Sequence, residues 1–244
     1  MNQPKRLSER EVSVYHERGF LKGYSIFDEL GVERLRRGFE ALMGRLAPGQ
    51  RASDICDWEK KEPFLYQLAT TPAVLDYVED LIGPNILLWS THFFCKEPGD
   101  GTVVAWHQDA RYWPLWPHRA VTVWLAFDDS DRQNGALKVV PGTHSIGLLR
   151  HDAADRAESV LSMQITPGAF DESEAEHIEL RAGEISLHDD NLVHGSDANT
   201  SERRRCGLTM RYMPPEVECD RSVWPAFSCR LVRGVDRFQH NVTW

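Results

Sequence analysis

Apolar residues in the first third of the chain recur at helical spacing. Ser8 and Glu11 form a capping box at the start of "EREVSVYHERGF", and Ser25 is expected to cap a second helix over "IFDELGVERLRRGFEALMGRL". Thr71 and Pro72 open a third segment, "AVLDYVEDLIG", which Gly83 closes. The pattern therefore predicts three helices that support another layer.

The pattern changes after Gly83 to short runs rich in Val, Leu, Phe and Trp, separated by turn signals such as Asn134-Gly135 and Pro141-Gly142. Many short strands with turns between them indicate a β-sandwich or a jelly-roll barrel. The predicted strands are "NILLWS", "HFFCKE", "TVVAWH", "AVTVWLAF", "GALKVVP", "EISLH" and "CGLTMRYM".

No repeat or linker divides the chain, so we expect a single domain over residues 1–244. Helical support is expected over 1–83, a jelly-roll core over 84–215 and a C-terminal extension over 216–244. The acidic stretch from about Arg150 to Glu176 has few periodic apolar residues. It is predicted to be a long insertion or a partly mobile loop.

Composition narrows the class of partner. The 244 residues carry a formal net charge of -9, which argues against nucleic acid as a partner. We find no apolar run long enough to cross a membrane and no targeting segment, so we expect a cytosolic protein. The five cysteines are scattered without a C-x-x-C pair, so reduced thiols without a role are expected.

Candidate chemistry begins in "AWHQDARYWPLW", where His107 and Asp109 end a predicted strand. Residues two apart in extended chain point to the same face, so both side chains can reach one ion. His194 stands just before a later strand, and two histidines with one carboxylate form the facial triad of non-haem Fe(II) oxygenases. A second His-x-Asp pair, His188 and Asp190, is interpreted as structural or as lying behind the ligands.

Three segments in this order resemble one family: "WHQD", "VTVWLAFDDSDRQNGALKVVPGTH" and "LVHGSDANTSERRRCGLTMRY". The chain resembles the phytanoyl-CoA dioxygenase family of Fe(II)/2-oxoglutarate oxygenases over most of its length. The resemblance implies a mainly β fold with flanking helices, the cupin-like double-stranded β-helix or jelly roll. It also implies that His107, Asp109 and His194 hold Fe(II).

The same resemblance implies a co-substrate site. Arg205, eleven residues after His194, is expected to bind the far carboxylate of 2-oxoglutarate, with Ser196 and Trp124 beside it and Lys96 lining the cavity. The co-substrate and O2 become succinate and CO2 while a small-molecule substrate is oxidised. Family relatives that halogenate have a small residue in place of the carboxylate, so the presence of Asp109 favours hydroxylation.

The aromatic run after the metal motif offers a substrate wall. Trp113 and Tyr112 are the candidates, with Trp116 as a weaker one, although aromatic residues near a turn are often simply packed. For Arg211, further along the strand that Arg205 begins, a structural salt bridge is expected.

Two other classes of function are compatible with a jelly roll. One is a non-catalytic metabolite-binding or sensing protein, and the other is an enzyme that uses the triad with another metal and no 2-oxoglutarate. Loss of a triad residue or of Arg205 would favour the first, and none of them is lost; the presence of Arg205 and Ser196 argues against the second. The substrate and the oligomeric state are left open by the sequence.

Overall fold

The computed structural model describes residues 6–155 and 159–244. The capping box of Ser8 and Glu11 is confirmed at the start of the first helix, and Thr71, Pro72 and Gly83 bound the last one as predicted. The expected cap at Ser25 is wrong, because Asp28 accepts the hydrogen bond from the Gly31 backbone N–H that begins the second helix. The α-helices are α1 (Glu9–Arg18), α2 (Glu29–Met43), α3 (Pro63–Ala69) and α4 (Pro72–Ile82).

The strands form two main antiparallel sheets. The larger sheet has the order β1-β10-β5-β12-β2-β14, and the smaller has the order β3-β11-β6-β9. The larger contains β1 (Phe20–Ser25), β2 (Ile86–Lys96), β5 (Val121–Ala126), β10 (Glu184–Asp189), β12 (Arg205–Met213) and β14 (Arg230–Arg233). The smaller contains β3 (Val104–His107), β6 (Leu137–Val139), β9 (Glu176–Ile178) and β11 (His194–Ser196). Two further pairs are β4 (Leu115–Trp116) with β13 (Glu218–Cys219), and β7 (His151–Ala153) with β8 (Met163–Ile165).

The alternation of side chains along β12 separates the core from the site. Leu208, Met210 and Tyr212 belong to the hydrophobic core that the helices share with the larger sheet. Arg205, Thr209 and Arg211 face the other way and line a pocket between the two sheets. Successive side chains of a strand point to opposite faces, so this one strand supports the fold with one face and the site with the other.

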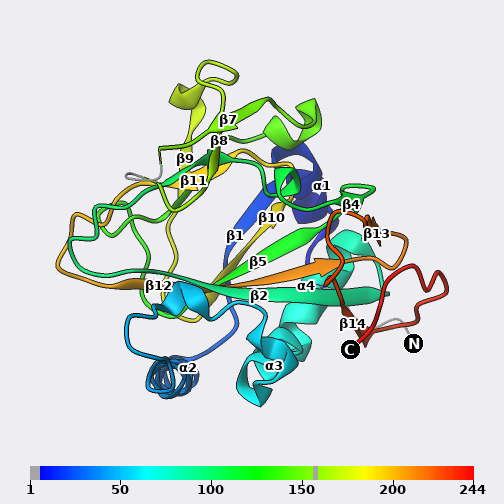
Figure 1. The fold of residues 1–244 in the computed structure, drawn as a ribbon, viewed down its shortest axis with the longest axis horizontal. Helices are drawn as coiled ribbons and strands as arrows, with labels where there is room; N and C mark the ends of the chain where they lie inside the picture. Colours follow the sequence, from blue (N-terminus) through cyan, green and yellow to red (C-terminus); the bar gives the residue numbers. More distant parts are fainter. Residues whose placement is uncertain (1–5, 156–158) are drawn as a thin grey trace.

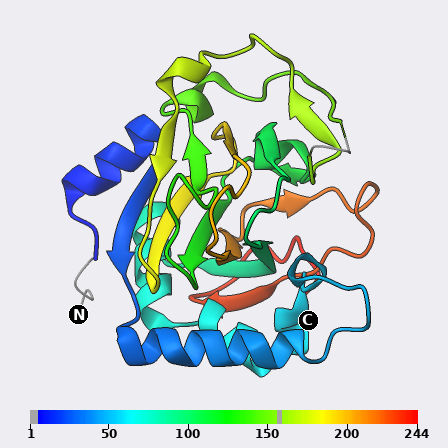
Figure 2. The same ribbon diagram turned by 90° about the vertical axis from the view of Figure 1, so that its left-hand side faces the viewer.

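Helices α2, α3 and α4 cover the outer face of the larger sheet, while β7, β8 and β11 lie on the opposite side (Figure 1). In the orthogonal view, α2 runs along the base of the molecule beneath the strands (Figure 2). Phe39 from α2 packs against Phe93 and Phe127 with ring centroids 4.9 and 6.1 Å apart. The predicted mainly β fold with flanking helices is therefore confirmed.

Four segments add detail to the expected organisation or differ from it. The support region contributes β1, which pairs with β10, and the C-terminal extension contributes β14, which pairs with β2, so both add strands to the larger sheet. "NILLWS" and "HFFCKE" form the single strand β2. The stretch from Arg150 to Glu176, interpreted as a long insertion or a partly mobile loop, contains the paired strands β7 and β8, whereas 156–158 lie outside the described residues.

Cys95 and Cys206 form a disulfide between β2 and β12, which corrects the expectation of reduced thiols for this pair. The two residues stand directly opposite each other in the register of the strands, with Cα atoms 4.1 Å apart. They are separated by 111 positions in the sequence, so spacing alone does not reveal the pair. Cys56, Cys219 and Cys229 are free.

Within the described residues, no helix combines the length and apolar character needed to span a bilayer. The cytosolic location remains a prediction.

Candidate active site

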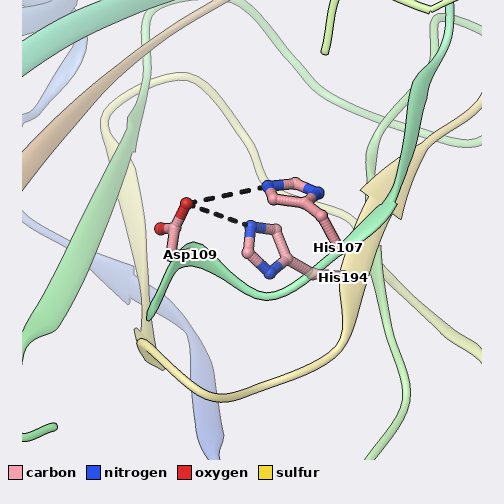
Figure 3. A group of neighbouring side chains, drawn as sticks. All are labelled: His107, Asp109 and His194. Atoms are coloured by element: carbon pink, nitrogen blue, oxygen red, sulfur yellow. Dashed lines mark ion pairs between the residues drawn. The ribbon is translucent and has the colours of Figure 1, made fainter. Parts of the chain in front are cut away.

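His107, Asp109 and His194 come together at one end of the smaller sheet. His107 ends β3, His194 begins β11, and the two residues are direct partners in the register of these strands. Their ring centroids are 4.0 Å apart. Asp109 follows in the 3-10 helix η3 (Asp109–Arg111), and one atom from each of the three side chains lies within 4.8 Å of the others. The predicted metal ligands therefore form one buried cluster (Figure 3).

Backbone carbonyls fix the orientation of both imidazole rings. Nδ1 of His107 lies 2.9 Å from the carbonyl oxygen of Ala105, and Nδ1 of His194 lies 2.8 Å from that of Leu192. A ring nitrogen that contacts a carbonyl oxygen carries the proton, so each Nε2 keeps a free lone pair. Both histidines are thus prepared to bind a metal through Nε2.

The two carboxylate oxygens of Asp109 have different surroundings. Oδ1 lies 3.6 Å from Nε2 of His107 and 3.9 Å from Nε2 of His194, the contacts drawn in Figure 3. Oδ2 accepts a hydrogen bond of 3.3 Å from the Thr122 hydroxyl. Oδ1 is therefore the oxygen available to a metal, while Thr122 on β5 holds the other.

Charge at the cluster suits a cation. Burial by itself raises the pKa of Asp109, but the interactions with His107 and His188 hold the pKa well below its usual range. Burial, together with His107, keeps the pKa of His194 well below its ordinary value. An ionised carboxylate beside a neutral imidazole is the protonation state that metal binding requires.

The second His-x-Asp pair is split by the structure. His188 is buried with Nε2 3.8 Å from Oδ2 of Asp109, on the side of the carboxylate that Thr122 holds. Asp190 instead accepts hydrogen bonds from the backbone N–H of Ala120 and the side chain of Asn191. His188 therefore lies beside Asp109, and Asp190 holds the backbone at Ala120.

Gln108, in the middle of the motif, is a structural residue that the sequence analysis overlooked. Its side-chain amide donates to the carbonyls of Gly147 and Asn191, and its Oε1 accepts from the Leu149 backbone N–H. The side chain is fully buried. Gln108 thus ties the chain between His107 and Asp109 to two neighbouring loops, and its place inside "WHQD" is the only signal in the sequence.

A small pocket of about 50 Å³ lies beside the triad, and Arg205, Ser196 and Trp124 all line it. The Arg205 guanidinium carbon is 5.6 Å from the centroid of the Trp124 ring, and Nη1 donates to the carbonyl of Phe94. Nε of Arg205 and Oγ of Ser196 are buried without hydrogen-bond partners. Burial lowers the pKa of Arg205 to about 10, so it remains a cation at neutral pH. A buried cation and hydroxyl that lack partners indicate a polar ligand.

Gly207 makes room for the Trp124 ring in this pocket. A Cβ atom at position 207 would overlap the indole, and Gly207 stands two residues after Arg205 on the same face of β12. A side chain here would displace the ring from its place beside the guanidinium.

Lys96 holds the edge of the pocket from β2. Its Nζ donates to the carbonyls of Thr102, Ser196 and Asp197. Burial and the charge of Arg205 lower the pKa of Lys96 to about 7. The amino group thus already has three carbonyl partners, one of which is the carbonyl of Ser196 itself.

A larger cavity of about 1040 Å³ opens in front of the triad. Trp113 and Tyr112 line it, as expected for a substrate wall, and the Tyr112 hydroxyl donates to the carbonyl of Met163 on β8. Trp116 is 72% exposed and does not line this cavity. Arg211 lines both cavities, and the expected salt bridge is wrong, because among the described residues no carboxylate pairs with it.

Comparison with known proteins identifies the family to which this site belongs. The profile of phytanoyl-CoA dioxygenase (PhyH) matches residues 15–207, a span that contains the triad and Arg205. The chain belongs to the phytanoyl-CoA dioxygenase family. It is 28% identical over 231 residues to the peroxisomal phytanoyl-CoA dioxygenase of Bos taurus, covering 84% of this chain and 68% of that protein.

Solved structures agree with the phytanoyl-CoA dioxygenase assignment. The apo form of the non-heme monooxygenase ThoJ is similar with a TM-score of 0.81 and 26% identity, covering 95% of this chain and 86% of that one. CytC3 with Fe(II) and alpha-ketoglutarate has a TM-score of 0.71 and 25% identity, covering 98% and 93% of the two chains. This member of the phytanoyl-CoA dioxygenase family is thus an Fe(II)/2-oxoglutarate-dependent dioxygenase, and its jelly-roll fold is the cupin-like fold of these oxygenases.

Proposed function

We propose that the protein hydroxylates a small molecule, with His107, Asp109 and His194 holding Fe(II) and Arg205 holding 2-oxoglutarate. One observation supports this most directly: the small pocket brings the triad together with Arg205 and Ser196, whose buried Nε and Oγ have no hydrogen-bond partner. A metal site and an anion site therefore share one cavity, which is what the two cofactors require.

The donor set fits iron. Two imidazole nitrogens and one carboxylate oxygen bind Fe(II) on one face and leave positions for a co-substrate and O2. The backbone contacts of His107 and His194 and the hydroxyl of Thr122 hold these donors in place before any metal arrives. When bound, the iron supplies the O2 activation that is coupled to decarboxylation of 2-oxoglutarate.

The pocket fits a dicarboxylate. Arg205 offers its Nε toward the far carboxylate, and Ser196 adds a hydroxyl donor. Trp124 contacts the guanidinium with its ring, which restrains the orientation of this planar group. Lys96 supports the site by holding the Ser196 carbonyl and by adding positive charge near Arg205.

Asp109 makes hydroxylation the expected outcome. Its carboxylate would take the position at the metal that a halide needs in relatives that halogenate, so the transfer of oxygen is favoured. Trp113 and Tyr112 form part of the wall of the larger cavity, where the substrate is expected to lie. Because both cavities include His107 and Asp109 among their walls, a molecule in the larger one is adjacent to the metal ligands.

The test is succinate formation by the Fe(II)-loaded protein. We expect 2-oxoglutarate to be converted to succinate, slowly without substrate and faster with a molecule that gains one oxygen atom. His107→Ala should abolish the reaction, and Arg205→Ala should raise the 2-oxoglutarate concentration needed for it. The Arg203→Ala protein is the matched control, because Arg203 is exposed and pairs with Asp131. Succinate formation by His107→Ala at the parent rate would refute the proposal.

A further inference from the structure

Arg211 is a buried arginine that forms no ion pair with a carboxylate among the described residues. It follows Arg205 on the inner face of β12 and is only 8% exposed. Its Nη1 donates to the Ser90 hydroxyl at 3.2 Å, and its Nε has no hydrogen-bond partner. Over residues 6–155 and 159–244, the ion pairs of the neighbouring arginines involve other acids: Asp131 for Arg203, and Asp128 and Glu40 for Arg204.

Two tryptophans hold the guanidinium of Arg211. Its central carbon is 5.0 Å from the centroid of the Trp113 ring and 5.6 Å from that of Trp89. The two rings meet edge to face, with centroids 4.7 Å apart. Contact with ring faces restrains the plane of the guanidinium but leaves its Nε–H without a hydrogen-bond partner. The side chain is thus oriented in advance for a planar partner.

The larger cavity is the space in which a ligand can reach Arg211. Arg211, Trp113 and Trp89 all line the space of about 1040 Å³ in front of the triad. The carboxylates of Asp57 and Asp109 line it too, but neither forms an ion pair with Arg211 within the described residues. A buried guanidinium without an acid is costly unless a ligand provides one.

We propose that Arg211 binds a carboxylate of the substrate, so that the protein acts on small organic acids whose apolar body packs against Trp89 and Trp113. This inference rests on the proposed function, since it takes the larger cavity as the substrate site. The planar fork of an arginine matches a carboxylate with two parallel hydrogen bonds. The aromatic walls exclude water from that pair and contact the remainder of the molecule.

The test compares matched acids and amides. Protein loaded with Fe(II) and 2-oxoglutarate without O2 is titrated by calorimetry with phenylacetate, 3-phenylpropanoate and indole-3-acetate, and with the corresponding amides. Each pair has the same body and differs in charge. We expect at least one acid to bind saturably and roughly tenfold or more tighter than its amide. Amides that bind as well as the acids, or no saturable binding of any acid, would overturn the proposal.

Variants assign the effect to Arg211. Arg211→Gln should weaken binding of the acid roughly ten- to a hundredfold and leave the amide unchanged. Arg211→Lys keeps the charge without the fork and should give an intermediate loss, which covers the case in which the Gln variant folds poorly. Arg51→Gln removes a charge from an exposed position on the same cavity, and a change below about twofold is expected there. An equal loss in Arg51→Gln and Arg211→Gln would mean that general charge, not Arg211, attracts the acid.

The affinity for 2-oxoglutarate separates this inference from the proposed function. Arg211→Gln should bind 2-oxoglutarate like the parent, whereas Arg205→Ala should not. If Arg211→Gln lost 2-oxoglutarate as strongly as Arg205→Ala, Arg211 would serve the co-substrate and the inference would fail while the function stood. If the parent bound neither Fe(II) nor 2-oxoglutarate, the proposed function would fail, and the acid and amide titrations of the unloaded protein would still decide whether Arg211 binds a carboxylate.

Discussion

His188 lies with its Nε2 3.8 Å from Oδ2 of Asp109, whereas the ring nitrogens of His107 and His194 face Oδ1 of the same carboxylate. The three histidines are thus divided between two oxygen atoms. Ligands of one metal must surround a common point, and the described residues that bring ligand atoms within 4.8 Å of one another are His107, Asp109 and His194, without His188. A fourth ligand is therefore not expected from His188, despite its burial and its position in a His-x-Asp step.

The first prediction concerns metal content. Purified protein should bind one Fe(II) per chain and, with 2-oxoglutarate and without O2, show a weak visible charge-transfer band. His107→Ala or Asp109→Ala should remove both signals, because each takes away one of three protein donors. His188→Ala should keep most of the band. Loss of the band in His188→Ala with retention in His107→Ala would mean that the triad is wrongly chosen.

The second prediction separates three adjacent arginines. Arg205→Ala should weaken 2-oxoglutarate binding roughly ten- to a hundredfold, since a charged hydrogen-bonded pair contributes about 1.5 to 3 kcal/mol. Arg203→Ala should cost less than about 1 kcal/mol in either binding or stability, because its pair with Asp131 is exposed. The measurement is the 2-oxoglutarate dependence of succinate formation. A large shift in Arg203→Ala with none in Arg205→Ala would contradict the assignment.

A third prediction concerns stability. Arg204 pairs with Asp128 and Glu40, and its guanidinium carbon lies 5.0 Å from the centroid of the Phe39 ring. These contacts join α2 to the larger sheet. Arg204→Ala should therefore lower the free energy of unfolding by roughly 1 to 3 kcal/mol in urea denaturation. Its 2-oxoglutarate affinity should match the parent; a shift as large as that of Arg205→Ala would place Arg204 in the co-substrate site instead.

The fourth prediction concerns Gly207. Gly207→Ala places a methyl group where the Trp124 ring lies, and overpacking of this kind costs about 1 to 3 kcal/mol. The displaced indole should also reduce 2-oxoglutarate affinity. Gly101→Ala is the control, because a Cβ there meets no atom within 4 Å. Thermal denaturation and calorimetry measure the two effects. A Gly207→Ala protein that matches Gly101→Ala in both would show that Trp124 does not depend on this glycine.

The fifth prediction is that the hairpin of β7 and β8 closes over a filled cavity. Val160 and Leu161 line the larger cavity, and the carbonyl of Met163 accepts a hydrogen bond from the Tyr112 hydroxyl. Trypsin should cut after the exposed Arg150 more slowly when Fe(II), 2-oxoglutarate and a bound acid are present. Cleavage after the exposed Lys61, which does not line the cavity, serves as the control. Equal rates at Arg150 with and without ligands would argue against closure.

Local chemistry allowed part of the fold to be predicted from the sequence. The capping box at Ser8 and the Pro72–Gly83 bounds depend on neighbouring residues, and both were confirmed. The cap at Ser25 failed because this residue ends a strand, β1, whose hydrogen bonds come from β10, about 160 positions later. The pairing of Cys95 with Cys206 was missed for the same reason. Contacts set by strand register leave no trace in local spacing.

The candidate site shows the same division. His107 and Asp109 are two positions apart, so the sequence itself suggests a shared ion, and the resemblance adds His194 and Arg205. Gln108 and Thr122 were not anticipated, because their importance lies in partners on distant loops and strands. Arg211 was expected to pair with an acid. Only the three-dimensional arrangement shows that its neighbours are tryptophans and that it forms no ion pair among the described residues.

Arg205 and Arg211 are six positions apart on one extended strand, so their backbone positions are about 20 Å apart along β12. Pairing with β2 and β5 holds this part of the strand, so the spacing of the two backbone positions does not adjust to the ligand. If one cation anchors the co-substrate and the other the substrate acid, β12 sets the spacing between the two bound molecules. The carbon that reacts would then be selected by its distance from the carboxylate, and lengthening the acid by one methylene would move oxidation to a different carbon of the chain.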